Sequence, residues 1–281
     1  MYTTIVDPST LYAHLDDPAW VIFDCRNDLA NPAAGEALYA EGHIPGAYGV
    51  QLERVLTGVK TGRNGRHPLP EPGAFAHFLQ AAGVGPATQI AAYDGGGGDM
   101  FAARFWFLAR WLGHAAVALL DGGYQAWTSA GFPVSREAPP PRQAPGGPAL
   151  EHDELTAQAG EILASLNGGH LLVLDARSPD RFAGQNEIID PVAGHIPGAA
   201  NRFYKENFDA SGRLKPAEVL RAEFAAAGVR SPVAVVHQCG SGVSACVNLL
   251  AMEHAGLRGS RLYPGSWSEW IADPARPVAR D

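Results

Sequence analysis

The sequence predicts an α/β protein built from two similar domains, each a mostly parallel β-sheet flanked by helices. Two observations predict this fold. The second half of the chain repeats motifs of the first half in the same order, and within each half short apolar runs alternate with helical stretches. The 281 residues accommodate two ordinary domains, and 46% of them are hydrophobic, which is enough for two cores.

Three motifs carry the repeat. They pair Phe23–Arg26 with Leu174–Arg177, Gly42–Ala47 with Gly194–Ala199, and Leu119–Trp127 with Leu262–Trp270. The second pair, GHIPGA, is identical in both copies. A spacing of roughly 145 residues is too long for the unit of a solenoid and indicates a duplicated domain.

A proline-rich stretch separates the two copies. Residues 139–148 read PPPRQAPGGP, and their prolines forbid a helix and disfavour a sheet, so we expect an extended linker there. The sequence therefore predicts an N-terminal domain at 1–138 and a C-terminal domain at 149–281.

Buried parallel strands are expected where short apolar runs precede a turn. These runs span residues 20–24, 89–93, 171–175 and 232–236. Helical stretches follow them, and in the second copy apolar residues recur at helical spacing at Val243, Val247, Leu250 and Ala251. In such a fold, function is expected at the carboxyl ends of the strands.

Composition and charge exclude several classes of function. The net charge of −8 disfavours nucleic acid or an anionic membrane as partner, and no apolar run is long enough to span a bilayer. The N-terminus lacks the pattern of a signal peptide, and three cysteines, an odd number, fit a reducing compartment, so we expect a cytoplasmic protein. No CxxC, His/Cys cluster or HExxH motif occurs, and we expect no metal and no cofactor.

The two copies differ at one informative place. After the second strand of copy one comes Asp94, in the stretch Asp94–Asp99; at the same point copy two has Cys239, in the loop Cys239–Ser244. Small residues let this loop curl with its amides inward, and the helix that follows adds positive potential. Both effects favour a thiolate. The amides expected to face it are those of Gly240, Ser241, Gly242, Val243 and Ser244.

A buried structural thiol is the alternative interpretation of Cys239. The Gly-Ser-Gly sequence that follows it at a helix start favours the nucleophile instead. By contrast, His43 and His195 recur in both copies, as do the Asp24–Arg26 and Asp175–Arg177 pairs, so we interpret them as scaffold rather than as catalytic groups.

Taken together, these motifs resemble the tandem-domain rhodanese family of thiosulfate and 3-mercaptopyruvate sulfurtransferases, over nearly the whole chain. The resemblance implies two rhodanese-like domains, of which the N-terminal one is catalytically silent. It implies that the C-terminal domain carries sulfur as a persulfide on Cys239. The expected partners are a small-molecule sulfur donor and a thiol, thioredoxin or cyanide acceptor.

The composition of the loop bears on the donor. Members of the family that prefer thiosulfate resemble Cys-Arg-Lys-Gly, whereas those that prefer 3-mercaptopyruvate resemble Cys-Gly-Ser-Gly, as here. Cations suit a dianion, and a mercapto acid has a thiol proton that must be moved. Ser241 is therefore a candidate catalytic residue that relays this proton or bonds the donor carbonyl, unless it only stabilises the loop. We predict 3-mercaptopyruvate as the donor, with a thiosulfate-preferring enzyme as the alternative.

Four further residues are candidates for substrate binding. Arg181 occupies the position of the family's carboxylate-binding arginine. Some mercaptopyruvate enzymes have a second arginine nine residues later, where this chain has Asp190, and Arg202 is a candidate substitute. From the first copy, Glu53 and His67 match acidic and histidine positions of the family's interdomain cleft. For Arg181, Glu53 and His67 a solvated surface position is the alternative.

Two other classes of function stay open. A Cys-dependent phosphatase of similar fold needs an arginine six residues after the cysteine, where this chain has Ala245. A non-catalytic regulatory or binding module is the second class; many such domains have lost the cysteine, which this chain retains.

Overall fold

The computed structural model describes residues 1–96, 100–142 and 152–280, which form two compact units. Unit 1 comprises Met1–Gly58, Leu69–His152 and Ala210–Leu214, and unit 2 comprises Val59–Pro68, Asp153–Asp209 and Lys215–Asp281. The short segment Val59–Pro68 thus belongs to unit 2 although it comes from the first half of the sequence. The predicted linker, 139–148, extends into residues outside the described part, so its boundaries stay a prediction.

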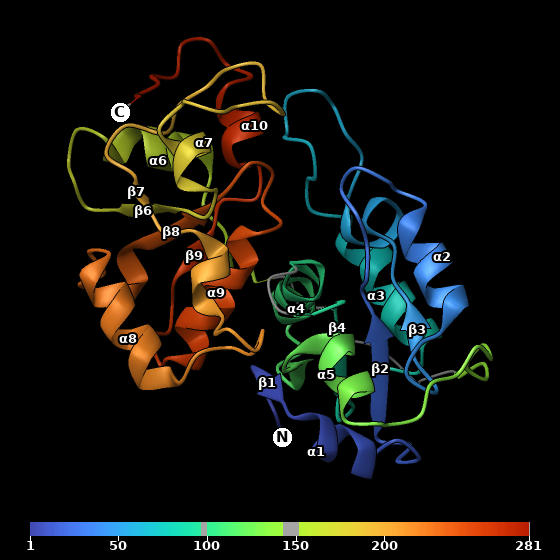
Figure 1. Ribbon diagram of the computed structural model, residues 1–281. Coiled ribbons are helices and arrows are strands. Elements are labelled where there is room, and N and C mark those ends of the chain that lie inside the picture. The colour runs from blue at the N-terminus through green and yellow to red at the C-terminus, as the bar shows by residue number, and fades with distance from the viewer. Residues whose placement is uncertain (97–99, 143–151, 281) are drawn as a thin grey trace. The chain divides into compact units, whose positions relative to one another are not determined.

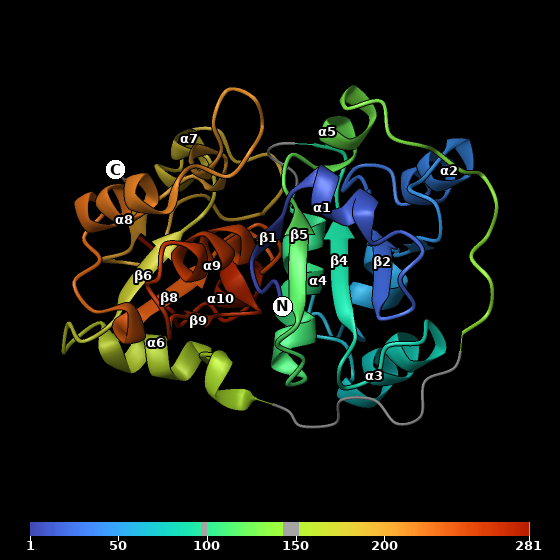
Figure 2. The ribbon, with the colours of Figure 1, turned by 90° about the horizontal axis from the view of Figure 1, so that it is seen from below.

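Unit 1 contains a parallel sheet with the strand order β1-β5-β4-β2-β3 (Figure 1 and Figure 2). Its strands are β1 (Ile5–Val6), β2 (Trp20–Asp24), β3 (Tyr48–Gly49), β4 (Gln89–Tyr93) and β5 (Val117–Leu120). Its helices are α1 (Pro8–Ala13), α2 (Ala34–Glu41), the π-helix η1 (Leu52–Leu56), α3 (Pro72–Ala81), α4 (Phe101–Trp111) and α5 (Gly123–Ser129).

Both faces of this sheet are covered, which explains why its strands are apolar throughout instead of alternating. On β2, Trp20 and Ile22 pack into a core that includes Leu11 of α1 and Trp127 of α5. Phe23 points to the other face, where its ring lies 4.6 Å from that of Phe105 of α4, centroid to centroid. All five residues of β2 are buried, as expected for a central parallel strand.

Unit 2 contains a smaller parallel sheet with the strand order β7-β6-β8-β9 (Figure 1). Its strands are β6 (Leu172–Asp175), β7 (Ala200–Asn201), β8 (Val235–Gln238) and β9 (Arg261–Leu262). Its α-helices are α6 (Ala159–Ser165), α7 (Pro179–Phe182), α8 (Ala217–Ala226), α9 (Ala245–His254) and α10 (Ser266–Trp270). Three short 3₁₀ helices complete it: η2 (Asp153–Leu155), η3 (Tyr204–Asn207) and η4 (Pro232–Ala234).

The predicted fold class is confirmed, with corrections to two boundaries. The strands expected at 20–24 and 89–93 are present, and that expected at 171–175 begins at Leu172. The strand expected at 232–236 instead starts at Val235, because Pro232 opens a 3₁₀ turn and Val233 is 65% exposed. β8 then continues through His237 and Gln238, two fully buried polar residues that the apolar pattern does not include.

The helix expected from Val243 begins two residues later, at Ala245. It is not buried on one face only: every residue from Ala245 to Met252 is buried. α9 packs against β8 and β9 on one side and against α8 on another, so it lies inside unit 2.

The repeated motifs form the same scaffold in each unit. Arg26 bonds Asp24 and donates to the carbonyl of Gly42 at 2.6 Å, and Arg177 bonds Asp175 and donates to that of Gly194 at 2.8 Å. The rings of the two GHIPGA histidines bond backbone carbonyl oxygens, which supports their interpretation as structural groups.

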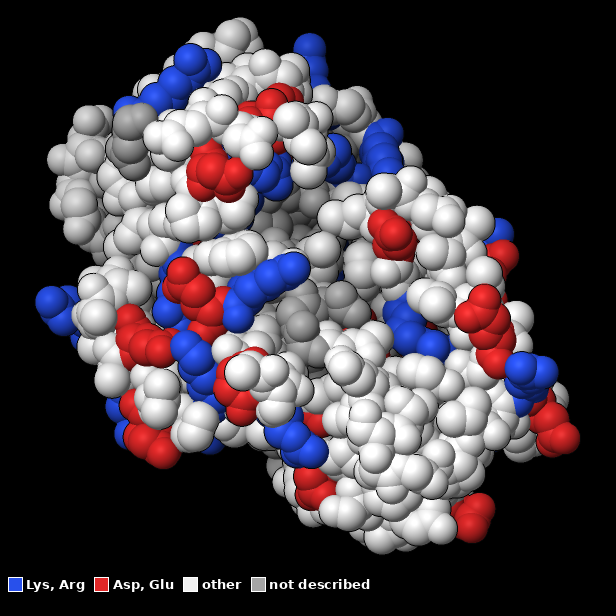
Figure 3. Space-filling view, in the orientation of Figure 1, with Lys and Arg blue, Asp and Glu red and all other residues white. Residues whose placement is uncertain are grey.

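The surface carries charges of both signs, interspersed on the face seen in Figure 3. Among the described residues, no helix has both the length and the apolar character needed to cross a membrane. The same part of the chain gathers no group of three or more His, Cys, Asp or Glu side chains suited to a metal ion.

Candidate active site

Cys239 stands at the carboxyl end of β8, which lies between β6 and β9 in the sheet of unit 2. Its side chain is buried, and the amide of Gly242 donates a hydrogen bond to its sulfur over 3.1 Å. Gly242 has φ +77°, and a Cβ at this position would overlap the carbonyl oxygen of Pro264. Glycine is therefore required here to turn an amide toward the sulfur.

The other expected loop amides stay predictions. These are the amides of Gly240, Ser241, Val243 and Ser244, all of which lie in the buried loop that leads into α9. The loop leads directly into α9, which begins at Ala245.

α10 anchors the loop through backbone and side-chain bonds. The amides of Trp267 and Ser268 each donate over 3.0 Å, to the carbonyl oxygens of Cys239 and Gly240 respectively. The amide of Cys239 donates to the hydroxyl of Ser266 over 3.1 Å, and this hydroxyl donates to the carbonyl of Tyr263 over 2.9 Å. Both the amide and the carbonyl group of Cys239 are thus held by residues of α10.

Ser266 is a functional candidate that the sequence analysis missed. It has φ +52° and is the only non-glycine residue with positive φ among the described residues. A signal was present in the repeat, because unit 1 has Gly123, with φ +60°, at the matching position. A serine kept where the other copy has glycine suggests that its hydroxyl is needed.

The matching loop of unit 1 has the same anchors but a different centre. The carbonyl oxygens of Asp94 and Gly95 accept hydrogen bonds from the amides of Tyr124 and Gln125, both over 2.8 Å. The Asp94 carboxylate accepts from the amide of Ala102 in the first turn of α4, over 3.0 Å. Where unit 2 has a sulfur, unit 1 has a carboxylate that caps a helix; residues 97–99 of this loop lie outside the described part.

Val59–Pro68 brings two consecutive residues to the Cys239 loop. His67 Nδ1 lies 2.8 Å from the hydroxyl oxygen of Ser241, and both residues are buried. The amide of Arg66 donates to the hydroxyl of Ser268 over 3.0 Å. The sequence-predicted residues Cys239, Ser241 and His67 therefore meet in one place within unit 2.

Arg181 lies in an ion-pair cluster beside the same loop. Its guanidinium bonds both carboxylate oxygens of Glu187 and lies 3.2 Å from the carboxylate of Asp190. Arg66 also pairs with Asp190. Glu187 and Arg66 were not among the sequence candidates, since neither a repeated motif nor the family resemblance pointed to them.

The electrostatics of the cluster follow from burial and pairing. Burial raises the pKa of Asp190 above its usual range, against the lowering effect of Arg66 and Arg181. Burial works in the same direction on Glu187, but hydrogen bonds from Arg181 and from backbone amides hold its pKa below the usual range. Burial works to lower the pKa of Arg177, yet Asp175, Glu187 and the Cys239 sulfur together raise it.

Two candidates lie elsewhere. Arg202 was expected to replace the missing second arginine, but its guanidinium bonds Glu206 over 2.9 Å and Glu223 over 2.5 Å. Its ion pairs are thus with other carboxylates than Glu187 and Asp190, which pair with Arg181, and its role in substrate binding stays a prediction. Glu53 is exposed on η1 of unit 1, and its role in substrate binding stays a prediction.

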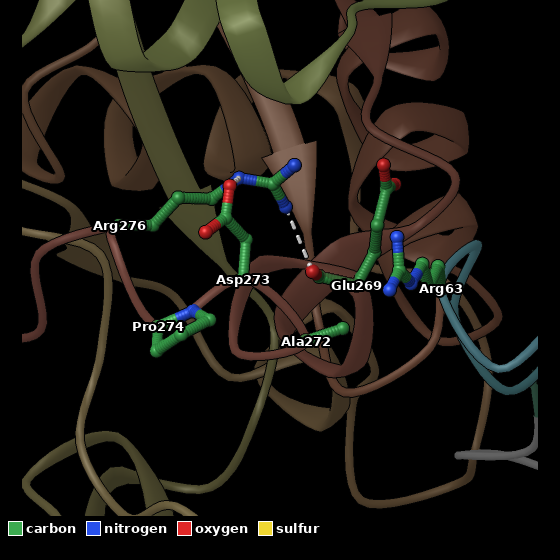
Figure 4. A pocket seen from close by; sticks show the side chains of 6 residues that line it. All are labelled: Arg63, Glu269, Ala272, Asp273, Pro274 and Arg276. Carbon is green, nitrogen blue, oxygen red and sulfur yellow. Dashed lines mark hydrogen bonds and ion pairs between the residues drawn. The ribbon is translucent and has the colours of Figure 1, made fainter.

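A pocket of about 370 Å³ opens beside α10 in unit 2 (Figure 4). Charged side chains of both signs line it, among them Arg63, Glu269 and Arg276, and Arg276 donates to the carbonyl oxygen of Glu269 over 2.7 Å. None of its lining residues belongs to the Cys239 loop, so we do not assign the sulfur chemistry to this pocket.

Comparisons with known proteins agree with the geometry. The model of the rhodanese-like domain matches residues 7–130 and again residues 158–273. A probable 3-mercaptopyruvate sulfurtransferase of Pseudomonas aeruginosa is 46% identical over 96% of this chain and 95% of its own. A putative thiosulfate sulfurtransferase of Mycobacterium tuberculosis is 38% identical over 92% of this chain and 90% of its own. The structure of 3-mercaptopyruvate sulfurtransferase from Leishmania major, 31% identical, superposes with a TM-score of 0.86 over 98% of this chain and 75% of its own.

Proposed function

This chain belongs to the rhodanese family as a tandem-domain sulfurtransferase, and from that premise we propose that it carries sulfur as a persulfide on Cys239. One observation carries the proposal: the Cys239 sulfur lies at the end of a central strand and accepts a hydrogen bond from the Gly242 amide over 3.1 Å. An amide in this position stabilises an anionic sulfur on Cys239, which is the form that attacks the donor.

The donor that fits best is 3-mercaptopyruvate. The Cys239 thiolate attacks the donor sulfur, the carbon–sulfur bond breaks, and its electron pair leaves as the enolate of pyruvate. The proton of the donor thiol then passes to the enolate carbon, which leaves pyruvate and a persulfide anion on Cys239. With thiosulfate the same attack releases sulfite, and no proton has to move.

The Ser241–His67 hydrogen bond supports the mercapto-acid donor for this reason. A buried hydroxyl 2.8 Å from an imidazole nitrogen is a group that can pass a proton from donor sulfur to enolate carbon. Arg181, beside the loop, supplies the cation for the donor carboxylate. Relatives of this chain bear the names of both donors, so similarity alone does not separate the two.

The persulfide then passes its outer sulfur to an acceptor. Attack by a thiolate, by a thioredoxin thiol or by cyanide regenerates the Cys239 thiolate and leaves the sulfur on the acceptor. We place the reaction in the cytoplasm, a reducing compartment, since all three cysteines are free thiols in the structure.

The test is the sulfur adduct itself. Treating the whole protein with 3-mercaptopyruvate should add one sulfur atom to Cys239, seen as roughly 32 Da in the mass of its peptide, and release pyruvate. Cys239→Ser should show neither, because an alcohol oxygen is a poor nucleophile at neutral pH and holds no transferable sulfur.

Cys246→Ala is the matched control, since Cys246 is also a buried thiol and follows the same loop on α9. It should keep the adduct and the turnover. Persistent pyruvate release by the folded Cys239→Ser variant would remove Cys239 from the reaction, and an adduct on Cys246 would move the persulfide to that residue.

A further inference from the structure

Arg66 lies directly over the Cys239 loop. A Cβ built on Gly240 would lie 2.8 Å from a terminal guanidinium nitrogen of Arg66 and 3.6 Å from one of Arg181. Glycine at position 240 therefore leaves the space that these two cations occupy. The loop has no cation of its own, but the fold supplies two from Val59–Pro68 and from α7.

Asp190 holds both cations in this place. Its carboxylate pairs with Arg66 and lies 3.2 Å from Arg181, and the position of a Cβ on Gly240 is only 3.7 Å from the same carboxylate. The Asp190 side chain is 2% exposed, whereas that of Arg66 is 34% exposed. A buried carboxylate thus pairs with the guanidinium of a partly exposed arginine side chain, and a guanidinium has further N–H donors that can bind an anion.

The charges of the cluster balance. The guanidinium groups of Arg66, Arg177 and Arg181 face the carboxylates of Asp175, Glu187 and Asp190. With all six ionised, the cluster has no net charge, so it offers directed hydrogen-bond donors without a strong positive potential. Such a site suits an anion of charge −1 better than an anion of charge −2.

We propose that Arg66 and Asp190 together set the donor selectivity of this enzyme: Arg66 binds the donor anion over Gly240, and Asp190 holds Arg66 and cancels one positive charge, so that a monoanionic mercapto acid is favoured over dianionic thiosulfate. This inference rests on the proposed function of Cys239. Asp190 acts through Arg66 and Arg181 and is a positioning residue.

Substitutions of Asp190 and of Arg66 should shift the donor preference in opposite directions. The quantity to measure is the ratio of kcat/KM for 3-mercaptopyruvate, from pyruvate release, to that for thiosulfate, from sulfite release. Asp190→Asn removes a negative charge and should lower this ratio roughly 5- to 50-fold. Arg66→Ala should weaken both donors, thiosulfate more, and so raise the ratio; Arg66→Lys should stay near the wild type.

Two further measurements distinguish an effect of charge on donor preference from a general loss of activity. The double variant Arg66→Ala/Asp190→Asn restores the balance of charge and should return the ratio toward that of the wild type. All shifts should shrink as ionic strength rises, because salt screens charges at a partly exposed site. Arg63→Ala, an exposed arginine of the same segment, is the control and should leave the ratio unchanged.

The inference is overturned if the ratio moves in the same direction in both single variants, or in neither. Calorimetric binding of pyruvate and of sulfate to the same variants makes the comparison of a monoanion with a dianion without any turnover. If turnover is absent but the variants bind the two anions as expected, only the proposed role of Cys239 is contradicted. If all variants bind pyruvate and sulfate equally, the proposed role of Arg66 and Asp190 is refuted.

Discussion

At the residue scale, the hydroxyl of Ser266 is connected to Cys239 through a single hydrogen bond. Ser266 holds φ +52°, a conformation that costs an L-residue about 1–2 kcal/mol and a glycine almost nothing. Its hydroxyl is the partner of the Cys239 amide, a buried donor that would otherwise be unsatisfied. The strained residue is therefore retained for its side chain.

Two substitutions of Ser266 separate the strain from the hydrogen bond. Ser266→Ala keeps the strain and leaves the Cys239 amide without a partner, which should lower the free energy of unfolding by about 1–3 kcal/mol. Ser266→Gly loses the same hydrogen bond but relieves the backbone strain, so its free energy of unfolding should fall by about 1 kcal/mol less than that of Ser266→Ala. Urea unfolding midpoints measure both, and a Ser266→Ala variant as stable as the wild type would contradict the assignment.

Local sequence patterns were sufficient to propose residues whose role is local, whereas a residue with a distant partner was proposed only where the family resemblance pointed to it, as for His67. Cys239 and its glycines could be proposed because the strand end, the loop and the helix start are contiguous in the chain. The pairing of Arg66 with Asp190 joins positions 124 residues apart, and no local pattern announces it. Arg202 was only a candidate substitute for a second substrate-binding arginine; its guanidinium pairs with carboxylates of η3 and α8, and its role in substrate binding stays a prediction.

At the scale of elements, one strand–loop–helix unit occurs twice with different chemistry. The repeat in the sequence revealed this arrangement. The backbone hydrogen bonds that hold each loop do not involve the side chain at its centre, which is Asp94 in unit 1 and Cys239 in unit 2. What apolar patterning missed was the extent of β8, where His237 and Gln238 are fully buried in spite of their polarity. Burial by surrounding elements overrides the apparent end of an apolar run.

Asp94→Ala tests whether the loop of unit 1 is structural only. Its carboxylate caps α4 through the amide of Ala102, so removal should lower the free energy of unfolding by about 0.5–2 kcal/mol. Turnover with 3-mercaptopyruvate should change less than about threefold, since no nucleophile is lost. Asp94→Asn, which keeps an acceptor oxygen, is the control for stability, and a loss of several hundredfold in turnover by folded Asp94→Ala would refute the silent role of this loop.

At the scale of the whole molecule, burial lowers the pKa of one histidine in each unit among the described residues. Burial lowers the pKa of His237 in unit 2 to about 3, and its ring bonds the hydroxyl of Ser260 over 3.1 Å. Burial also lowers the pKa of His114 in unit 1, where the ring bonds the carbonyl of Thr88 over 2.8 Å. Both groups therefore take up a proton more readily in the unfolded chain than in the folded one.

The sign of the resulting pH dependence is fixed by this difference. Below the usual histidine pKa of 6.5, the unfolded state binds protons that these two histidines refuse in the folded state, so stability is lost as the pH falls below about 6.5. For His237 this loss continues toward pH 3, and its slope approaches about 1.4 kcal/mol per pH unit. Hydrogen bonds lower the pKa of Asp7 to about 2, so its contribution to stability is lost only at lower pH, as the pH falls below its ordinary pKa of 3.8 toward 2.

We expect the urea midpoint of the wild type to fall between pH 6.5 and pH 5, and His237→Gln to reduce that fall by removing one of the protons. His114→Gln should remove the other, and the two effects should add because the residues belong to different units. If unfolding resolves into two transitions, each substitution should flatten only the transition of its own unit. A His237→Gln variant whose midpoint retains the full dependence between pH 6.5 and 5 would show that His237 is not the group that takes up the proton.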